Sequence, residues 1–196
     1  MRALSNSPCI LSICTDNLSY SAIILLSLPT NEPKIGLVTV LYNSIEVLED
    51  FFQSLVNQSY KNFILYVIDN SPNDDVLNDA IRLSNKFNIN SVFINNNANL
   101  GVAKGNNQGI EQSLKDNCEY VLLLNNDIEF AQDTIKDLVE YTVKNDVSII
   151  VPKIHYHNTN KIWTAGGHIS KLKGTSPHRG ELEEDVGQYE NIEYVN

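Results

Sequence analysis

The chain has 196 residues, of which 42% are hydrophobic and 19% are charged, a balance typical of a globular protein with one substantial core. Its formal net charge of −10 argues against a nucleic-acid-binding surface, which needs a face rich in lysine and arginine. A phosphate-bearing ligand would therefore have to be held by backbone N–H groups, a helix terminus or a metal ion.

The first 33 residues differ from the rest of the chain. Their apolar patches are interrupted by Asp16 and Asn17, and the apolar run over 21–28 is too short to span a bilayer. We expect residues 1–33 to be a disordered or misassigned leader, with a peripheral membrane association as the alternative. Three cysteines without metal or redox spacing indicate a reducing compartment, and hence the cytoplasm.

From residue 34 onward, β-branched runs alternate with stretches of helical period. Strands are predicted at 34–42, 62–70, 90–95, 120–126 and 147–152. Helices are predicted at 43–58, 76–87, 102–117 and 133–145, the first with Asn43 and Glu46 as a capping pair. The alternation predicts an α/β, Rossmann-like domain over 34–152 with a mainly parallel, helix-covered sheet. An irregular excursion is expected over 153–196, with weak strand signals at 161–164 and 192–195.

Polar residues follow the carboxyl ends of the predicted strands. Right-handed crossovers bring these ends to one edge of the sheet, where ligands bind. We therefore expect the following residues to converge: Tyr42, Asn43, Asp69, Asn70, Asn95, Asn125, Asn126 and Asp127. Asp127 is poorly placed to cap the next helix and better suited to a hard cation, Mg²⁺ or Mn²⁺, completed by substrate phosphates. Asp69 has two compatible roles: an Asx-turn into Ser71, or acceptance of the ring N–H of a pyrimidine base.

Further residues carry weaker signals. The glycines at 101, 105 and 109 match neither the dinucleotide nor the P-loop fingerprint. Gly105 and Gly109 would share one helix face and allow close packing on the sheet, whereas Gly101 would serve a tight loop after Asn99. The spacing of the four histidines does not match that of a zinc site. The acidic run at 181–185 is expected to be exposed to solvent. Trp163 suits either a sugar pocket or a core.

Four segments in this order resemble the inverting, nucleotide-sugar-dependent glycosyltransferases of family 2, which have the GT-A fold, and especially the rhamnosyltransferase-like ones. The segments are VTVLYNS, VIDNSPND, NNNANLGVAKGNNQGI and YVLLLNNDIEF, within about residues 35–152. The resemblance implies a donor domain over 34–152 that binds dTDP-rhamnose or a UDP-sugar. It also implies transfer with inversion to a saccharide or lipid-linked acceptor in cell-surface polysaccharide synthesis.

The resemblance assigns roles to ten residues. The base would be held by Leu41, Tyr42, Asn43 and Asp69, and the donor would be bordered by Asn99, Gly101 and Asn107. The family's D-x-D position reads Asn125-Asn126-Asp127 here, so metal binding rests on Asp127 alone. An amide in place of the first acid can still hydrogen-bond a ribose or sugar hydroxyl, but it contributes no charge.

The family pattern continues beyond EYVN into an acidic motif that carries the general base, so no catalytic residue is assigned. We expect the chain to be the donor-binding half of an enzyme, weak or inactive alone. A non-catalytic nucleotide-sugar-binding protein is the main alternative. A receiver domain is disfavoured because Tyr42-Asn43 replaces its acidic pair, and a nucleotidyltransferase because no Gly-rich basic loop follows the first strand.

Overall fold

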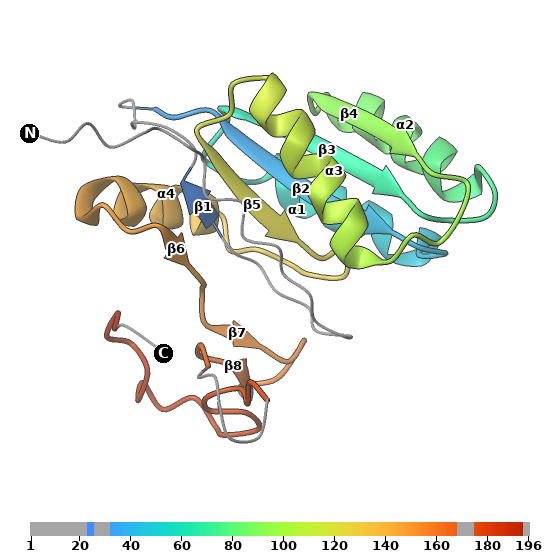
Figure 1. Ribbon diagram of the computed structural model, residues 1–196. Coiled ribbons are helices and arrows are strands. Elements are labelled where there is room, and N and C mark those ends of the chain that lie inside the picture. The colour runs from blue at the N-terminus through green and yellow to red at the C-terminus, as the bar shows by residue number, and fades with distance from the viewer. Residues whose placement is uncertain (1–22, 26–31, 168–174, 194–196) are drawn as a thin grey trace, which may run out of the picture. The chain divides into compact units, whose positions relative to one another are not determined.

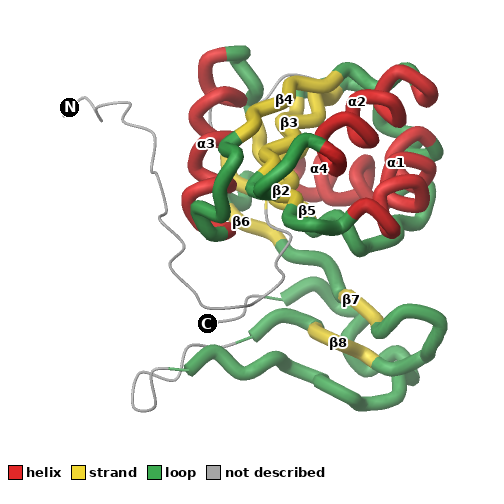
Figure 2. Tube along the Cα trace, turned by 90° about the vertical axis from the view of Figure 1, so that its right-hand side faces the viewer, coloured by secondary structure: helices red, strands yellow, loops and turns green. Residues whose placement is uncertain are grey.

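The computed structural model describes residues 23–25, 32–167 and 175–193. The chain divides into two compact units, residues 1–150 and 151–196. The first unit contains a six-stranded sheet in the order β4-β3-β2-β5-β1-β6, and helices lie on both of its faces (Figure 1; Figure 2). Among the described residues, no helix is both long and apolar enough to cross a membrane.

Four parallel strands form the centre of this sheet, as the sequence predicts. They are β2 (Ile35–Leu41), β3 (Phe63–Asp69), β4 (Ser91–Asn95) and β5 (Tyr120–Leu124). The helices that follow them are η1 (Ile45–Val47) with α1 (Leu48–Val56), α2 (Asp75–Phe87), α3 (Val102–Lys115) and α4 (Thr134–Asn145). The predicted α/β class with a mainly parallel, helix-covered sheet is confirmed.

Two short strands extend the sheet beyond β5, the first antiparallel to β5 and the second parallel to it. The strand β1 (Ile23–Leu25) pairs with β5 on one side and with β6 (Ile149–Ile150) on the other. Residues 23–25, which the sequence placed in the leader, form this strand, because an apolar triplet with two β-branched isoleucines can pair with the otherwise open edge of β5. Residues 1–22 and 26–31 lie outside the described part of the chain.

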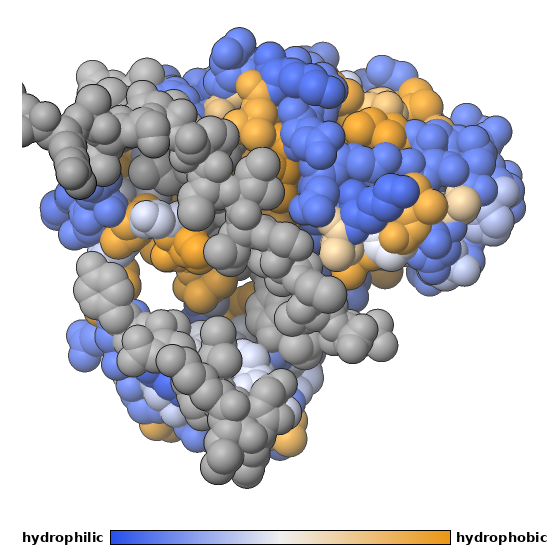
Figure 3. All heavy atoms as spheres, in the orientation of Figure 1, coloured by the Kyte–Doolittle hydropathy of each residue, from blue (hydrophilic) through white to orange (hydrophobic). Residues whose placement is uncertain are grey.

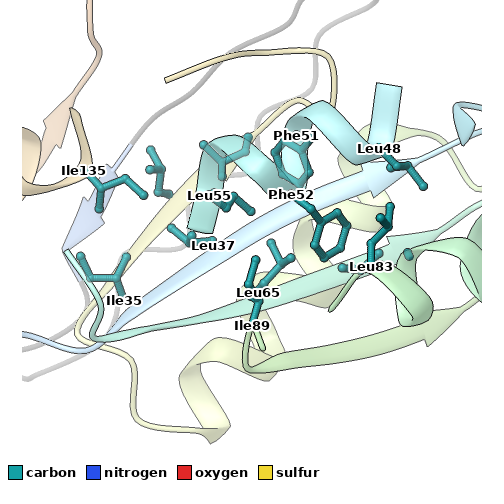
Figure 4. Packing of buried hydrophobic residues seen from close by; sticks show 14 of the residues in the cluster. Ile35, Leu37, Leu48, Phe51, Phe52, Leu55, Leu65, Leu83, Ile89 and Ile135 are labelled. Carbon is teal, nitrogen blue, oxygen red and sulfur yellow. The ribbon is translucent and has the colours of Figure 1, made fainter. Parts of the chain in front are cut away.

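The core is divided by the sheet into two layers. One layer packs strand residues against α1, α2 and α4, and Figure 4 shows Leu37 and Leu65 below Phe52 and Leu55 of α1. The other layer packs the alternate strand residues, such as Val38, beneath α3. Because successive strand side chains point to opposite faces, a continuous apolar strand requires cover on both sides.

The glycines of α3 allow this helix to lie directly on the sheet. A Cβ built on Gly109 would stand 2.3 Å from Cγ1 of Val38, and one built on Gly105 would stand 2.7 Å from Cγ2 of Val40. Both distances are far below van der Waals contact, so the predicted close-packing role of these two glycines is confirmed. The packing fixes the position of the α3 N-terminus relative to β2.

The second unit is a small antiparallel structure organised by one carboxylate. Its strands β7 (Ile154–His155) and β8 (Ile162–Thr164) pair with each other, which confirms the predicted strand near 161–164. Oδ2 of Asp185 lies 2.5 Å from Nζ of Lys153 and 2.6 Å from Nε2 of His155. The Lys153 ammonium, the Gly187 N–H and His155 hold the pKa of Asp185 below its usual range.

Two expectations for this unit are corrected. The acidic run at 181–185 is not uniformly solvated, because the Asp185 side chain is only 11% exposed and is held by its ion pairs. The second predicted strand, at 192–195, is not present over 192–193, and its last residues lie outside the described ranges.

Candidate functional site

Three parallel strands bring the predicted polar residues to one edge of the sheet. The arrowheads of β2, β3 and β5 point to this edge (Figure 1). Leu41 at the end of β2 is in register with Asp69 at the end of β3, and Asp69 is in register with Asn95 of β4. On the other side of β2, Thr39 is in register with Leu124, so the chain enters the 125–127 turn at the same edge. The strands that carry Asp69 and Asp127 are two strand spacings apart, about 10 Å.

Asp69 is held by a local turn. The Ser71 N–H donates to its Oδ1 at 2.9 Å, which confirms the expected Asx-turn. Its Oδ2 is buried and has no hydrogen-bond partner among the described residues. Because the residue is 0% exposed, a ligand can reach this oxygen only when neighbouring side chains move aside. Asp69 therefore lies at the strand end, as expected, but its side chain is not exposed to a crevice.

Hydrogen bonds connect the segment after β2 to the segments after both neighbouring strands. The Asn43 N–H donates to Oγ of Ser71 at 3.0 Å, and Nδ2 of Asn126 donates to Oγ of Ser44 at 2.5 Å. Asn43 has a φ of 49°, a left-handed conformation that asparagine tolerates well. No side chain caps η1, so the predicted Asn43–Glu46 capping pair is wrong, and the helix begins instead with a 3₁₀ turn.

A network of amides connects β3, the loop after β4 and α3. Nδ2 of Asn70 donates to the Gly101 carbonyl at 3.3 Å, and Nδ2 of Asn96 donates to Oδ1 of Asn70 at 2.8 Å. Asn96 and Gln108 also exchange two side-chain hydrogen bonds, at 2.8 and 2.9 Å. Sequence reasoning did not identify Asn96 or Gln108, and the only available signal was the asparagine-rich loop itself.

Gly101 forms the predicted tight loop at the start of α3. Its φ is 79°, and its N–H donates to Oδ1 of Asn99 at 3.0 Å. No side chain caps the helix, and its first turn contains no acidic residue. The first N–H groups of α3 therefore remain a favourable place for an anion.

Asn107 is the predicted site residue that the structure does not bring to this edge. It lies about 200° around α3 from Gly105, which contacts the sheet, so it is on the opposite side of the helix. Its predicted role at the donor border receives no support from this placement.

The turn after β5 presents one free carboxylate. Asp127 is exposed and makes no hydrogen bond or ion pair with other described residues, whereas Asn125 and Asn126 are half-buried. No group of three or more histidine, cysteine or acidic residues that could hold a metal occurs in the described ranges. The chain thus offers one carboxylate here, which suits Mg²⁺ or Mn²⁺ only where substrate phosphates and water complete the coordination.

Exposed large side chains also occur in the segments that follow β2 and lead into α3. Tyr42 is 51% exposed, and Leu100 and Val102 beside Gly101 are also exposed. Leu41 is completely buried, so only its backbone can face a ligand. Ligands of α/β sheets bind at the carboxyl edge of the strands, so this edge, with its two carboxylates and Tyr42, is the candidate ligand site.

The sequence comparisons identify the family. Residues 37–192 match the model described as Glycosyl transferase family 2, so the protein belongs to glycosyltransferase family 2. The chain is also similar to the multifunctional procollagen lysine hydroxylase and glycosyltransferase of Caenorhabditis elegans. The two are 28% identical over 126 residues, which are 62% of this chain and 17% of the worm protein.

Two solved structures have the same fold. The mannosyltransferase PcManGT from Pyrobaculum calidifontis, in complex with GDP-Man and Mn²⁺, is 17% identical and has a TM-score of 0.51. S. aureus TarS 1–349, in complex with UDP, is 21% identical and has a TM-score of 0.50. In each case the match covers 58% of this chain and 33% of the other. The fold is therefore GT-A-like, and the chain spans a third or less of the length of these relatives.

Proposed function

We propose that the carboxyl edge of β2, β3 and β5 binds a nucleoside-diphosphate sugar, and that the protein acts as the donor-binding part of an inverting glycosyltransferase. The acceptor in this proposal is a saccharide or lipid-linked saccharide of cell-surface polysaccharide synthesis, and the location is the cytoplasm or the inner face of its membrane. The observation that carries the proposal is the buried Oδ2 of Asp69, which lacks a partner in the described part of the chain.

The Asp69 carboxylate favours a pyrimidine base. The Ser71 N–H occupies one oxygen and leaves one acceptor free. Uracil and thymine each present a single ring N–H, which matches one acceptor. Guanine presents a ring N–H beside an amino group, and this pair of donors is best met by both oxygens of a carboxylate. The donor is therefore a UDP-sugar or dTDP-rhamnose in this proposal, with Tyr42 against the base.

The remaining predicted residues suit the diphosphate and the sugar. Asp127 would hold Mg²⁺ or Mn²⁺ together with the diphosphate, and the cation would offset the charge of the leaving group. Because the chain carries a net charge of −10, this cation and the uncapped N-terminus of α3 are its means of attracting an anionic donor. The Asn125 and Asn126 amides would hydrogen-bond the ribose or sugar hydroxyls.

Binding without turnover is the second candidate. In this candidate the same carboxyl edge binds the nucleotide-sugar, and no transfer follows. Incubation with UDP-sugars and a panel of saccharide acceptors distinguishes the two candidates. Measurable sugar transfer by this chain alone would exclude binding without turnover.

Calorimetric titration with UDP, dTDP and GDP in the presence of Mn²⁺ tests the proposal. We expect UDP or dTDP to bind, and GDP to bind about tenfold more weakly or worse, because one N–H of guanine would be left without an acceptor. Equal affinity for GDP, or binding unaffected by Asp69→Asn, would refute the proposed base site. Asp137→Asn on the exposed face of α4 is the matched charge-removal control.

A further inference from the structure

The strand β4 is an edge strand with one neighbour and a complete set of outward backbone groups. The Leu65 N–H donates to the Asn90 carbonyl, and the Asn96 N–H donates to the Asp69 carbonyl, both at 2.9 Å. In a parallel ladder alternate residues of a strand bond to the same neighbour. Val92 and Ile94 therefore bond to β3, whereas Ser91, Phe93 and Asn95 direct their N–H and C=O groups away from the sheet. Among the described residues, these outward groups have no backbone partner.

Within the described part of the chain, β4 carries none of the charges, prolines or bulges that commonly protect an exposed edge. Exposed edges are usually protected by charged side chains, proline or a bulge. No charged residue and no proline occurs between Lys86 and Lys104, although the chain contains 14 basic and 24 acidic residues. The pairing of β4 with β3 is regular over its full length.

Apolar side chains of β4 are incompletely covered on both faces of the sheet. Phe93 is partly buried against the α1–α2 layer of the core, and Val92 and Ile94 are partly buried against the α3 layer. Figure 3 shows apolar surface over β4 beside the polar outer face of α3. Aromatic and β-branched side chains of this kind are stabilised by partners directly opposite on a neighbouring strand.

We propose that β4 pairs antiparallel with β4 of a second copy of this chain, about a two-fold axis at Phe93. In this register Phe93 lies opposite Phe93 of the second copy, and Ser91 lies opposite Asn95. These are the residues with outward groups, so every outward N–H meets a C=O. Val92 and Ile94 then lie opposite each other on the α3 face. The edge is thus complementary to itself, as a two-fold interface requires.

Local charge does not oppose a second copy at this surface. Two molecules with a net charge of −10 repel each other, and a segment without charges is where they can approach most closely. The nearest acid bound to the strand is Asp74, whose Oδ1 accepts from Nδ2 of Asn95 at 2.7 Å. Antiparallel pairing keeps the two Asp74 side chains at opposite ends of the paired strands.

Oxidative cross-linking of variants with one added cysteine tests the register. The background carries Cys9→Ser and Cys14→Ser, and it keeps the buried Cys118. In Phe93→Cys the two Cα atoms would be about 5.5 Å apart, within disulfide reach. In the matched variant Ser91→Cys the equivalent atoms would be about 14 Å apart, four residues along the strand. We expect dimer cross-linking for Phe93→Cys only, and equal cross-linking of both variants or none for Phe93→Cys would overturn the proposal.

Sedimentation of the full chain over a range of concentrations provides an independent test. We expect a monomer–dimer equilibrium and a roughly tenfold weaker dimer in Ser91→Pro, which removes an outward N–H but no bond to β3. Ser91→Ala removes the hydroxyl contacts with Ser84 and Ile89 but keeps the N–H, so it should dimerise like the parent. A parent that stays monomeric at all concentrations, or that forms only large aggregates, would overturn the proposal.

Discussion

The backbone N–H of Ser71 donates to Oδ1 of Asp69 at 2.9 Å, and this bond determines which half of the carboxylate remains available. The other oxygen is buried without a partner in the described residues, at the end of a strand adjacent to β2. A buried acceptor without a partner costs about 1–3 kcal/mol. A ligand N–H that donates to this oxygen would remove that cost.

Asp69→Asn should separate binding from stability. The amide oxygen can still accept from the Ser71 N–H, but the amide nitrogen then meets the base as a second donor. We expect nucleotide binding to weaken by about 1.5–3 kcal/mol and the free energy of unfolding to stay level or rise by about 1 kcal/mol. Calorimetry and urea denaturation measure the two quantities, and a large loss of stability would show that the carboxylate serves the fold instead.

Asp127→Asn should remove the metal-dependent part of nucleotide binding. Asp127 is the free carboxylate of the turn after β5, and its neighbours Asn125 and Asn126 are neutral. We expect the variant to bind UDP or dTDP in Mn²⁺ as weakly as the parent protein binds it in EDTA. Asp137→Asn should behave like the parent, and an undiminished response of Asp127→Asn to Mn²⁺ would place the metal elsewhere.

Gly109→Ala should destabilise the protein through a steric conflict. The new Cβ would stand 2.3 Å from Cγ1 of the fully buried Val38. Overpacking costs about 1–3 kcal/mol, which exceeds the gain of about 1 kcal/mol from better helix propensity. Thermal unfolding measures the loss, and Asn106→Ala on the same helix should cause none. In a double-mutant cycle, Val38→Ala should recover part of the loss, and purely additive effects would contradict the proposed contact.

Acidification should loosen the second unit through Asp185. Its pKa is held below the usual value by Lys153, the Gly187 N–H and His155, so the folded state favours the ionised form. This contribution to stability is present above the ordinary pKa of about 3.9 and is lost as the pH falls below it. The emission of Trp163, the single tryptophan of the chain, should shift to the red between about pH 5 and pH 2.

Two variants check this pH dependence. Asp185→Asn should show the shifted emission already at pH 7, because the carboxylate that accepts from Lys153 and His155 is gone. Glu184→Gln removes an exposed neighbouring charge and should retain the emission of the parent protein. Acid-insensitive emission in the parent would contradict the role assigned to Asp185.

The central fold was predictable because buried parallel strands appear in a sequence as uninterrupted apolar runs. Residues 63–69 and 120–124 have this pattern, and the structure places strands there. The positions of Asp69 and Asp127 at one edge followed from the parallel topology alone. The packing role of Gly109 was predictable for the same reason, since its helix had to lie on a strand.

Contacts between distant residues were not predictable from one sequence. The Asn96–Gln108 pair and the Asn126–Ser44 bond depend on how separate loops meet in space. The burial of Asp69 likewise depends on packing that a strand-end position does not specify. Asp185 appeared as one acid in a charged run, and only the fold shows that Lys153 and His155 converge on it.

Amide chemical-shift mapping with a diamagnetic metal is the most direct test of the proposed donor site. A titration of the ¹⁵N-labelled chain with UDP or dTDP in Mg²⁺ should shift the Ser71 and Asn126 amides together, since these lie at the ends of β3 and β5. The amide of Asn107, on the far side of α3, should shift least. Shifts confined to Asn107 or to the second unit, with Ser71 and Asn126 unchanged, would contradict a donor site at the carboxyl edge.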